Sequence, residues 1–135
     1  MIFADTGFFL STVEPRDALH SRARAWIATL HEPLLLTEFV LLEVINPLSP
    51  FRDRHKVEGL VTHVRCSAGY TIVPVTSELL NAGLVMHIVR PDKEGSLTDC
   101  ISFVVLKQRG IACALAHDHH FEQAGFEAWL RRDPP

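Results

Sequence analysis

The sequence has no apolar run long enough to cross a membrane, no low-complexity segment and no large excess of charge. A membrane span requires about 18 consecutive apolar residues, and no segment of the 135-residue chain reaches that length. The net charge is only −3 with histidines neutral, which argues against a general surface for polyanions. Nucleic acid is not excluded, because a metal site supplies its own positive charge. We therefore expect no membrane association.

Cysteine is also scarce. Cys66, Cys100 and Cys113 are odd in number and form no CxxC pair, so we predict reduced thiols rather than a disulfide framework. The N-terminal stretch MIFADTGFF lacks the basic region that opens a signal peptide. These features together predict a cytoplasmic protein.

Hydrophobic residues, by contrast, are plentiful. They make up 47% of the chain, which is enough to bury the core of one domain without staples. We predict a single domain over residues 1–130, followed by a short polar tail, RRDPP, over residues 131–135. Such a tail is expected to be unordered.

Apolar runs of strand length alternate with segments of helical periodicity along the whole chain. Strands are predicted at residues 1–4, 34–37, 71–75 and 111–116, with a last short one in FEAWL at 126–130. Helices are predicted at residues 6–13, 16–31, 38–48, 53–67, 77–89 and 96–110. We expect Pro47 to break or bend the third helix and Pro74 to lie in an edge strand or at a strand end. Thr76 is predicted to cap the fifth helix, and Gly69 is predicted to be the C′ residue of the fourth. The alternation predicts an α/β fold, in which a mostly parallel sheet is covered by helices on both faces.

Four acidic residues occupy positions that such a sheet brings together. Asp5 follows the first predicted strand and Asp118 follows the fourth, while Glu43 and Asp99 lie on helices that can overhang the same edge. In open parallel sheets, ligands bind beyond the carboxyl ends of the strands. Clustered carboxylates repel one another unless a cation is present, and Mg²⁺ and Mn²⁺ are the ions that such oxygen ligands suit. The pattern therefore indicates a metal site capable of phosphodiester chemistry.

Each acid also has a purely structural interpretation. Asp99 stands three residues after Ser96, as in a capping box. Asp5 can cap the short helix that follows it, and Asp118 can cap the turn into HHFEQAG. Glu43 is harder to explain in this way, because its neighbours in VLLEVI are apolar and a lone charge among them needs a partner. For any single acid the structural interpretation is the simpler one, and only their joint placement favours chemistry.

These residues resemble the PIN domain family and, within it, the VapC-type toxins of toxin–antitoxin pairs. The resemblance covers nearly the whole chain in order, through MIFADTGFFL, LLLTEFVLLEVIN, DKEGSLTDCISFVVLKQRGI and ALAHDHHFEQAGF. The third stretch, which begins at Asp92, is the most specific. Two positions differ from the family's usual residues, since Gly7 and Ala116 stand where Ser and Thr are common, and each change removes a hydroxyl.

The resemblance implies a three-layer α/β/α fold and a metal-dependent endoribonuclease with Mg²⁺ or Mn²⁺ as cofactor. It maps Asp5, Glu43, Asp99 and Asp118 onto the family's acidic quartet, which is both catalytic and metal-holding. It also implies an RNA substrate, a homodimer and a cognate antitoxin that inserts a peptide segment with a basic side chain. Further residues are predicted to support the site or to contact substrate: Thr6, Thr98, Lys93, His119 and His120. Arg90 and Arg109 are candidates for attracting RNA phosphates, although surface solvation explains them equally well.

Three alternatives are weighed against this hypothesis. The HDHH cluster, with His117, His119 and His120 around Asp118, offers ligands for Zn²⁺, although its spacing is not that of a helical i, i+4 pair. A phospho-accepting receiver domain is disfavoured, because Asp5 has no acidic neighbour and no Lys follows IACALA. A PIN-like module that binds RNA or a partner without cutting is the serious competitor. Retention of all four acids favours cutting, because a pure binder gains nothing from clustered like charge.

Overall fold

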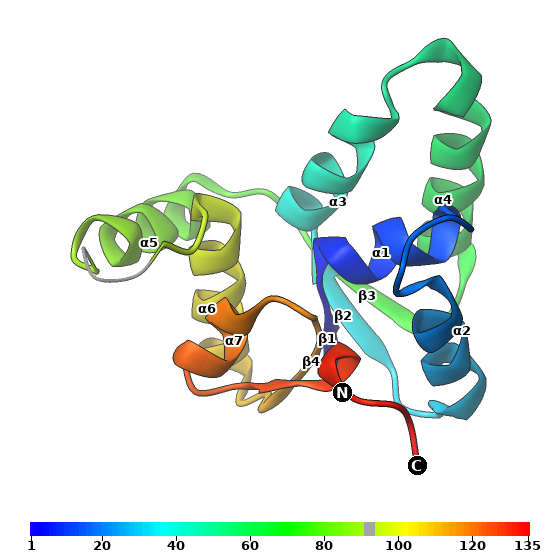
Figure 1. Cartoon of the computed structure of the whole chain (residues 1–135). Helices are drawn as coiled ribbons and strands as arrows, with labels where there is room; N and C mark the ends of the chain where they lie inside the picture. The colour runs from blue at the N-terminus through cyan, green and yellow to red at the C-terminus, as the bar shows by residue number, and fades with distance from the viewer. Residues whose placement is uncertain (91–93) are drawn as a thin grey trace.

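The structure, a computed structural model, describes residues 1–90 and 94–135 (Figure 1). The strands are β1 (Ile2–Ala4), β2 (Leu34–Thr37), β3 (Tyr70–Val73), β4 (Cys113–Leu115) and β5 (Glu127–Ala128). The helices are α1 (Thr6–Val13), α2 (His20–Thr29), α3 (Glu38–Ile45), α4 (Arg54–Cys66), α5 (Ser77–Ile88), α6 (Leu97–Arg109) and α7 (His119–Gln123), with 3₁₀ turns η1 (Asn46–Leu48), η2 (Phe51–Asp53) and η3 (Trp129–Arg131). Within the described ranges, no helix has both the length and the apolar character that a membrane crossing demands.

The five strands form one parallel sheet in the order β3-β2-β1-β4-β5. Phe3 pairs with Leu35 on one side and with Ala114 on the other, so β1 is the central strand. The chain builds outward from β1 to β2 and β3, and then crosses to β4 and β5 on the other side. This reversal creates a switch point at the carboxyl ends of β1 and β4, which is where ligands bind in folds of this kind.

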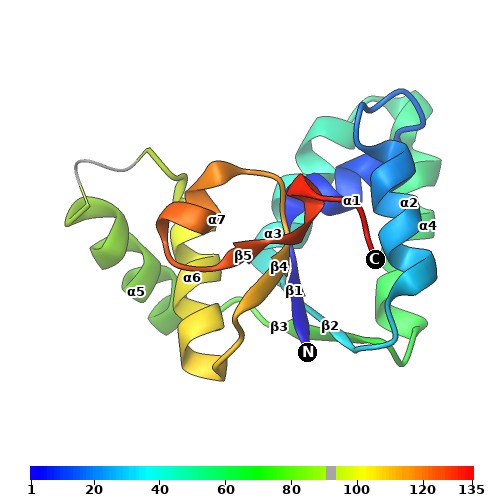
Figure 2. The same cartoon turned by 60° about the horizontal axis from the view of Figure 1, so that its bottom comes forward.

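Helices cover both faces of the sheet (Figures 1 and 2). Helices α1, α2 and α4 lie on one side, whereas α5, α6 and α7 lie on the other. Helix α3 contacts both α1 and α6, so it links the two helical layers. The predicted three-layer α/β/α sandwich is therefore confirmed.

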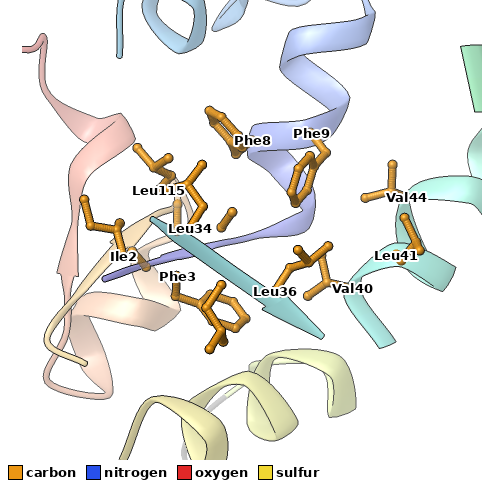
Figure 3. Close-up of a cluster of buried hydrophobic side chains, with 14 of the residues drawn as sticks. Ile2, Phe3, Phe8, Phe9, Leu34, Leu36, Val40, Leu41, Val44 and Leu115 are labelled. Carbon is orange, nitrogen blue, oxygen red and sulfur yellow. The ribbon is translucent and has the colours of Figure 1, made fainter. Parts of the chain in front are cut away.

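Aromatic side chains fill the core on both faces of the sheet. Figure 3 shows Phe8 and Phe9 of α1 on one side of β1 and β2 and Phe3 on the other. Phe3 and Phe103 of α6 both contact Phe121 of α7, with ring centroids 6.4 and 5.0 Å apart. Phe121 is fully buried, so it anchors α7 and fixes the loop that carries Asp118.

Several element ends lie where the sequence predicts them. The Thr76 hydroxyl accepts a hydrogen bond from the backbone N–H of Leu79 at 3.1 Å and caps α5. Helix α3 gives way to a 3₁₀ turn at Pro47, and the edge strand β3 stops before Pro74. Gly110 ends α6 with φ of 65°, a left-handed conformation that favours glycine.

Other local predictions are wrong. Gly69 does not have positive φ, and α4 ends in an extended Ser67. The Gly69 carbonyl instead accepts a hydrogen bond from Leu34 N–H at 2.8 Å, which ties the loop to the sheet. In FEAWL only Glu127–Ala128 forms a strand, because the next residues turn inward and the N–H of Leu130 bonds the carbonyl of Ala116 at 3.1 Å.

Residues 131–135, predicted as a loose tail, lie against α2. The indole N–H of Trp26 donates to the carbonyl of Arg132 at 2.9 Å, and the Arg22 guanidinium pairs with Asp133 at 2.9 Å. Trp26 also stacks on Trp129, with ring centroids 5.1 Å apart. This aromatic pair, in which Trp26 is buried and Trp129 is half-buried, thus fastens the C-terminal residues to the domain.

Candidate functional site

The four predicted acids meet in one cleft at the switch point. Asp5, Glu43, Asp99 and Asp118 all line a cavity of about 360 Å³ at the carboxyl ends of β1 and β4. The N–H of Asp5 donates to the carbonyl of Leu115 at 3.2 Å, which extends the pairing of β1 and β4 to the edge of the cleft. Sheet topology therefore unites acids from opposite ends of the chain.

Asp5 is the deepest of these acids. It holds the N-cap position of α1 but makes no side-chain capping bond, so the structural interpretation of this residue fails. Its Oδ1 is buried and has no hydrogen-bond partner within the described structure. Burial raises the pKa of Asp5 to about 8, and the charge of Asp99 adds to this effect. An orphaned carboxylate oxygen of this kind calls for a cation.

Asp99 serves two structural purposes at once. Its carboxylate accepts a hydrogen bond from the N–H of Ser96, while the Ser96 hydroxyl accepts one from the N–H of Asp99, which is a complete capping box. The same carboxylate lines the cleft. Burial raises the pKa of Asp99, as do the charges of Asp118 and Glu43, while the Ser96 hydrogen bond opposes the rise. The capping interpretation is therefore confirmed for Asp99, and the same residue lies in the cleft where the site is predicted.

Asp118 and Glu43 form more exposed walls of the cleft. Asp118 caps α7, its Oδ1 accepting a hydrogen bond from the N–H of His120 at 3.0 Å. Glu43 is half-buried on α3, and its charge raises the pKa of both Asp5 and Asp99. The charged residues nearest to Glu43 in the cleft are thus other acids, which cannot pair with it. A cation shared among these acids would supply the partner that Glu43 lacks among its apolar sequence neighbours.

The other predicted residues fall into three groups. Thr6 and His120 line the cleft, and His119 stands at its rim beside Asp118. Thr98 is half-buried in the first turn of α6 but is not part of the cleft lining. Lys93 lies outside the described residues. Thr6 and the two histidines thus lie at or beside the cleft, whereas Thr98 is not among its lining residues.

The two arginine candidates are separated by the structure. Arg90 lines a small pocket that shares His120 with the acidic cleft. Arg109 is at the opposite end of α6 from Asp99, and a 13-residue helix is roughly 20 Å long. Arg109 therefore does not flank the cleft.

Glu94 adds a fifth carboxylate to the cleft lining, and the sequence pattern does not single it out. Its place two residues before the Ser96 cap is the feature of the sequence that points to it. Of the two family departures, Gly7 lines the cleft, whereas Ala116 is fully buried. Only the change at Gly7 therefore alters the cleft surface directly.

The donor set of the cleft fits a hard divalent ion. Asp5 Oδ1 and Thr6 Oγ1 are buried without hydrogen-bond partners in the described structure. The carboxylates around them bring negative charge to the cleft. Carboxylate, hydroxyl and water oxygens are the ligands that Mg²⁺ and Mn²⁺ prefer. A cation here would satisfy the orphaned oxygens and offset the mutual repulsion of the acids.

Comparisons with known proteins agree with this geometry. The profile of the PIN domain matches residues 2–127. The 23S rRNA-specific endonuclease VapC20 of Mycobacterium tuberculosis is 29% identical over 126 residues, which span 93% of this chain and 95% of that protein. This sequence match therefore covers both proteins almost from end to end.

Solved structures show the same similarity in three dimensions. The crystal structure of Mycobacterium tuberculosis VapC20, described as a sarcin-ricin loop cleaving toxin, superposes with a TM-score of 0.83 at 27% identity and covers 93% of this chain and 96% of that one. FitAcB from Neisseria gonorrhoeae superposes with a TM-score of 0.70 at 18% identity, covering 95% of this chain and 96% of that one. The second match concerns the fold alone.

Proposed function

The chain belongs to the PIN domain family, and from this premise we propose that it is a metal-dependent endoribonuclease and the toxin of a toxin–antitoxin pair. The observation that carries the proposal is the meeting of four carboxylates around the Oδ1 of Asp5, which has no hydrogen-bond partner among residues 1–90 and 94–135. Repulsion among these carboxylates destabilises a protein that has no ion bound. The same carboxylates can hold a divalent ion next to a phosphodiester.

We assign a role to each residue of the cleft according to how deeply its side chain is buried. When bound, a divalent ion activates water for attack and neutralises charge on the phosphate. Asp5 and Asp99, the two buried acids, would hold the ion, and the Thr6 hydroxyl would donate to a carboxylate or to an ordered water. Asp118 and Glu43, on the more open walls, would orient the attacking water and add oxygen donors for the ion. No covalent nucleophile is required, and oxygen donors favour Mg²⁺ or Mn²⁺.

The substrate and the partners follow from the relatives. VapC20 is named for its action on 23S rRNA, so ribosomal RNA is the first substrate to test, and such a substrate implies action in the cytoplasm. We expect a cognate antitoxin that closes the acidic cleft with a basic side chain. We also expect a homodimer, for which the exposed apolar residues of α5 and of its C-cap, Val89, offer a surface: Leu80, Leu84, Val85, Ile88 and Val89.

A module that binds RNA without cutting is the remaining competitor. It predicts RNA binding that needs neither the acids nor the ion. The full set of acids at one cleft favours the enzyme, because like charges repel phosphate unless a cation lies between them.

Cleavage of RNA in Mg²⁺ or Mn²⁺ tests the proposal directly. Wild type should cut total RNA or isolated ribosomes, EDTA should stop the reaction, and Asp5→Asn should lower the rate at least about a hundredfold. Asp133→Asn is the matched control, because it removes a carboxylate that pairs with Arg22 outside the cleft. RNA binding without any cleavage by wild type would favour the non-cutting module instead.

A further inference from the structure

The HDHH segment places one carboxylate and two imidazoles within reach of a single ion. One donor atom from each of Asp118, His119 and His120 can be chosen so that all lie within 4.8 Å of one another. Asp118 Oδ1 is 3.5 Å from His119 Nδ1 and 3.6 Å from His120 Nε2. The two imidazole rings are 4.3 Å apart between centroids. Small side-chain adjustments bring three such atoms to the roughly 2.0–2.2 Å bond lengths of a transition-metal ion.

The segment is held in a fixed conformation. Asp118 Oδ1 accepts the N–H of His120 at 3.0 Å, and the buried ring of Phe121 anchors the next residue in the core. Consecutive residues at a helix start therefore converge, although their spacing is not the i, i+4 pattern of a helical metal site. The side chains of Asp118 and His119 are 41% and 60% exposed, and that of His120 is 16% exposed. A bound ion would keep open positions for water or substrate.

The donor chemistry differs between the two sides of the cleft. Asp5 and Asp99 offer oxygen alone, whereas Asp118 stands beside two imidazoles, which suit Zn²⁺ and other transition metals far better than Mg²⁺.

We propose that Asp118, His119 and His120 bind a divalent transition-metal ion at the rim of the cleft, at a position separate from the ion held by Asp5 and Asp99. This gives the cleft two cation positions of different preference, one for hard ions and one for borderline ions. The effect of the rim ion on RNA cleavage rests on the proposed function, whereas the binding of the ion does not.

Titration calorimetry with Zn²⁺ on the full chain tests the site. Wild type should bind one Zn²⁺ that millimolar Mg²⁺ does not displace. His119→Gln and His120→Gln should each weaken this binding at least about tenfold, since loss of even a supporting group costs that much at metal sites. His117→Gln is the matched control, because it removes an exposed imidazole of the same loop that is outside the three-residue cluster. Asp5→Asn should leave the zinc affinity unchanged within about threefold.

Two results would overturn the assignment: zinc binding that survives in both His119→Gln and His120→Gln, or an equal loss in His117→Gln. Melting curves of each variant without metal show whether the fold is intact, and a variant that melts like wild type but loses zinc supports the site. RNA cleavage in Mg²⁺ is measured in parallel. Cleavage without a histidine-dependent zinc site removes this inference alone, whereas a zinc site without cleavage removes the proposed function alone.

Discussion

Ser96 and Asp99 bond each other's backbone N–H groups through their side chains, both at 3.1 Å, at the first turn of α6. The carboxylate that closes this capping box is also a wall of the acidic cleft. The Asp99 side chain therefore stabilises the start of α6 and also places a carboxylate in the cleft. Its two contributions, hydrogen bonding and charge, can be separated by substitution.

Asp99→Asn should abolish RNA cleavage without loss of stability. Asn keeps an oxygen that accepts the Ser96 N–H but loses the negative charge, so the melting temperature without metal should be unchanged or higher. Asp99→Ala loses the acceptor as well and should lower the free energy of unfolding by about 1 kcal/mol. Thermal unfolding and cleavage assays on both variants make the comparison.

Ser96→Ala is the reciprocal test of the capping box. It removes the hydroxyl that accepts the Asp99 N–H but leaves the acid, so it should cost about 1 kcal/mol of stability while metal binding persists. Should Asp99→Asn be as unstable as Asp99→Ala, with metal binding intact, the carboxylate would be structural only.

The metal-free protein should become less stable as pH rises from 4 to 8. The pKa of Asp5 is raised from 3.8 to about 8 in the native state, so the folded chain keeps a proton that the unfolded chain releases. The stabilisation is complete below pH 3.8 and is lost as pH rises toward 8, with a slope of about 1.4 kcal/mol per pH unit for one proton. Urea unfolding at several pH values measures it.

Asp5→Asn should flatten that pH dependence, because the amide does not titrate. Saturating Mn²⁺ should also weaken or reverse the slope in wild type, since the ion binds the ionised carboxylate. An Asp5→Asn protein with the wild-type slope would mean that another group carries the pH dependence.

Mg²⁺ or Mn²⁺ should raise the melting temperature by several degrees. An ion at about one hundred times its dissociation constant stabilises the native state by about 2.7 kcal/mol, and it also relieves the repulsion among the acids. Differential scanning fluorimetry with and without EDTA measures the shift. Asp133→Asn should retain it and Asp5→Asn should lose it. An equal shift in both variants would place the ion elsewhere.

Gly83→Ala should destabilise the protein by about 1–3 kcal/mol. A Cβ at Gly83 would overlap Ile101 Cγ1 and lie 3.2 Å from the backbone N and Cα of Ile101, so α5 would be pushed away from α6. Gly59→Ala is the matched control, since a Cβ there meets nothing within 4 Å and should stabilise α4 by about 0.5–1 kcal/mol. Chemical denaturation compares the two, and a neutral Gly83→Ala would show that the helices can separate freely.

The sequence predicts best the features that local chemistry decides. The Thr76 cap, the Gly110 terminus and the Ser96–Asp99 box each depend on residues within one helical turn, and all are confirmed. The meeting of Asp5 with Asp118 is also predictable, because the strand–helix alternation fixes a parallel sheet and its carboxyl edge.

Long-range contacts explain most of what the sequence does not reveal. Gly69 bonds to Leu34 and Leu130 bonds to Ala116, and neither partner is visible from the local pattern. The hydrogen bond from the indole N–H of Trp26 to the carbonyl of Arg132 likewise joins segments that are distant in the sequence. The sequence does not indicate a role for Glu94, because a charged loop residue usually faces solvent. Its place in the cleft lining is visible only in the structure.

The place of β1 has a consequence for protein synthesis. This strand is translated first, yet it pairs with β4, which emerges only near the end of the chain. Until then Asp5 has no Asp118 across the cleft, and pairing between such distant segments forms late. The acidic cleft is therefore complete only when translation of the chain is nearly finished.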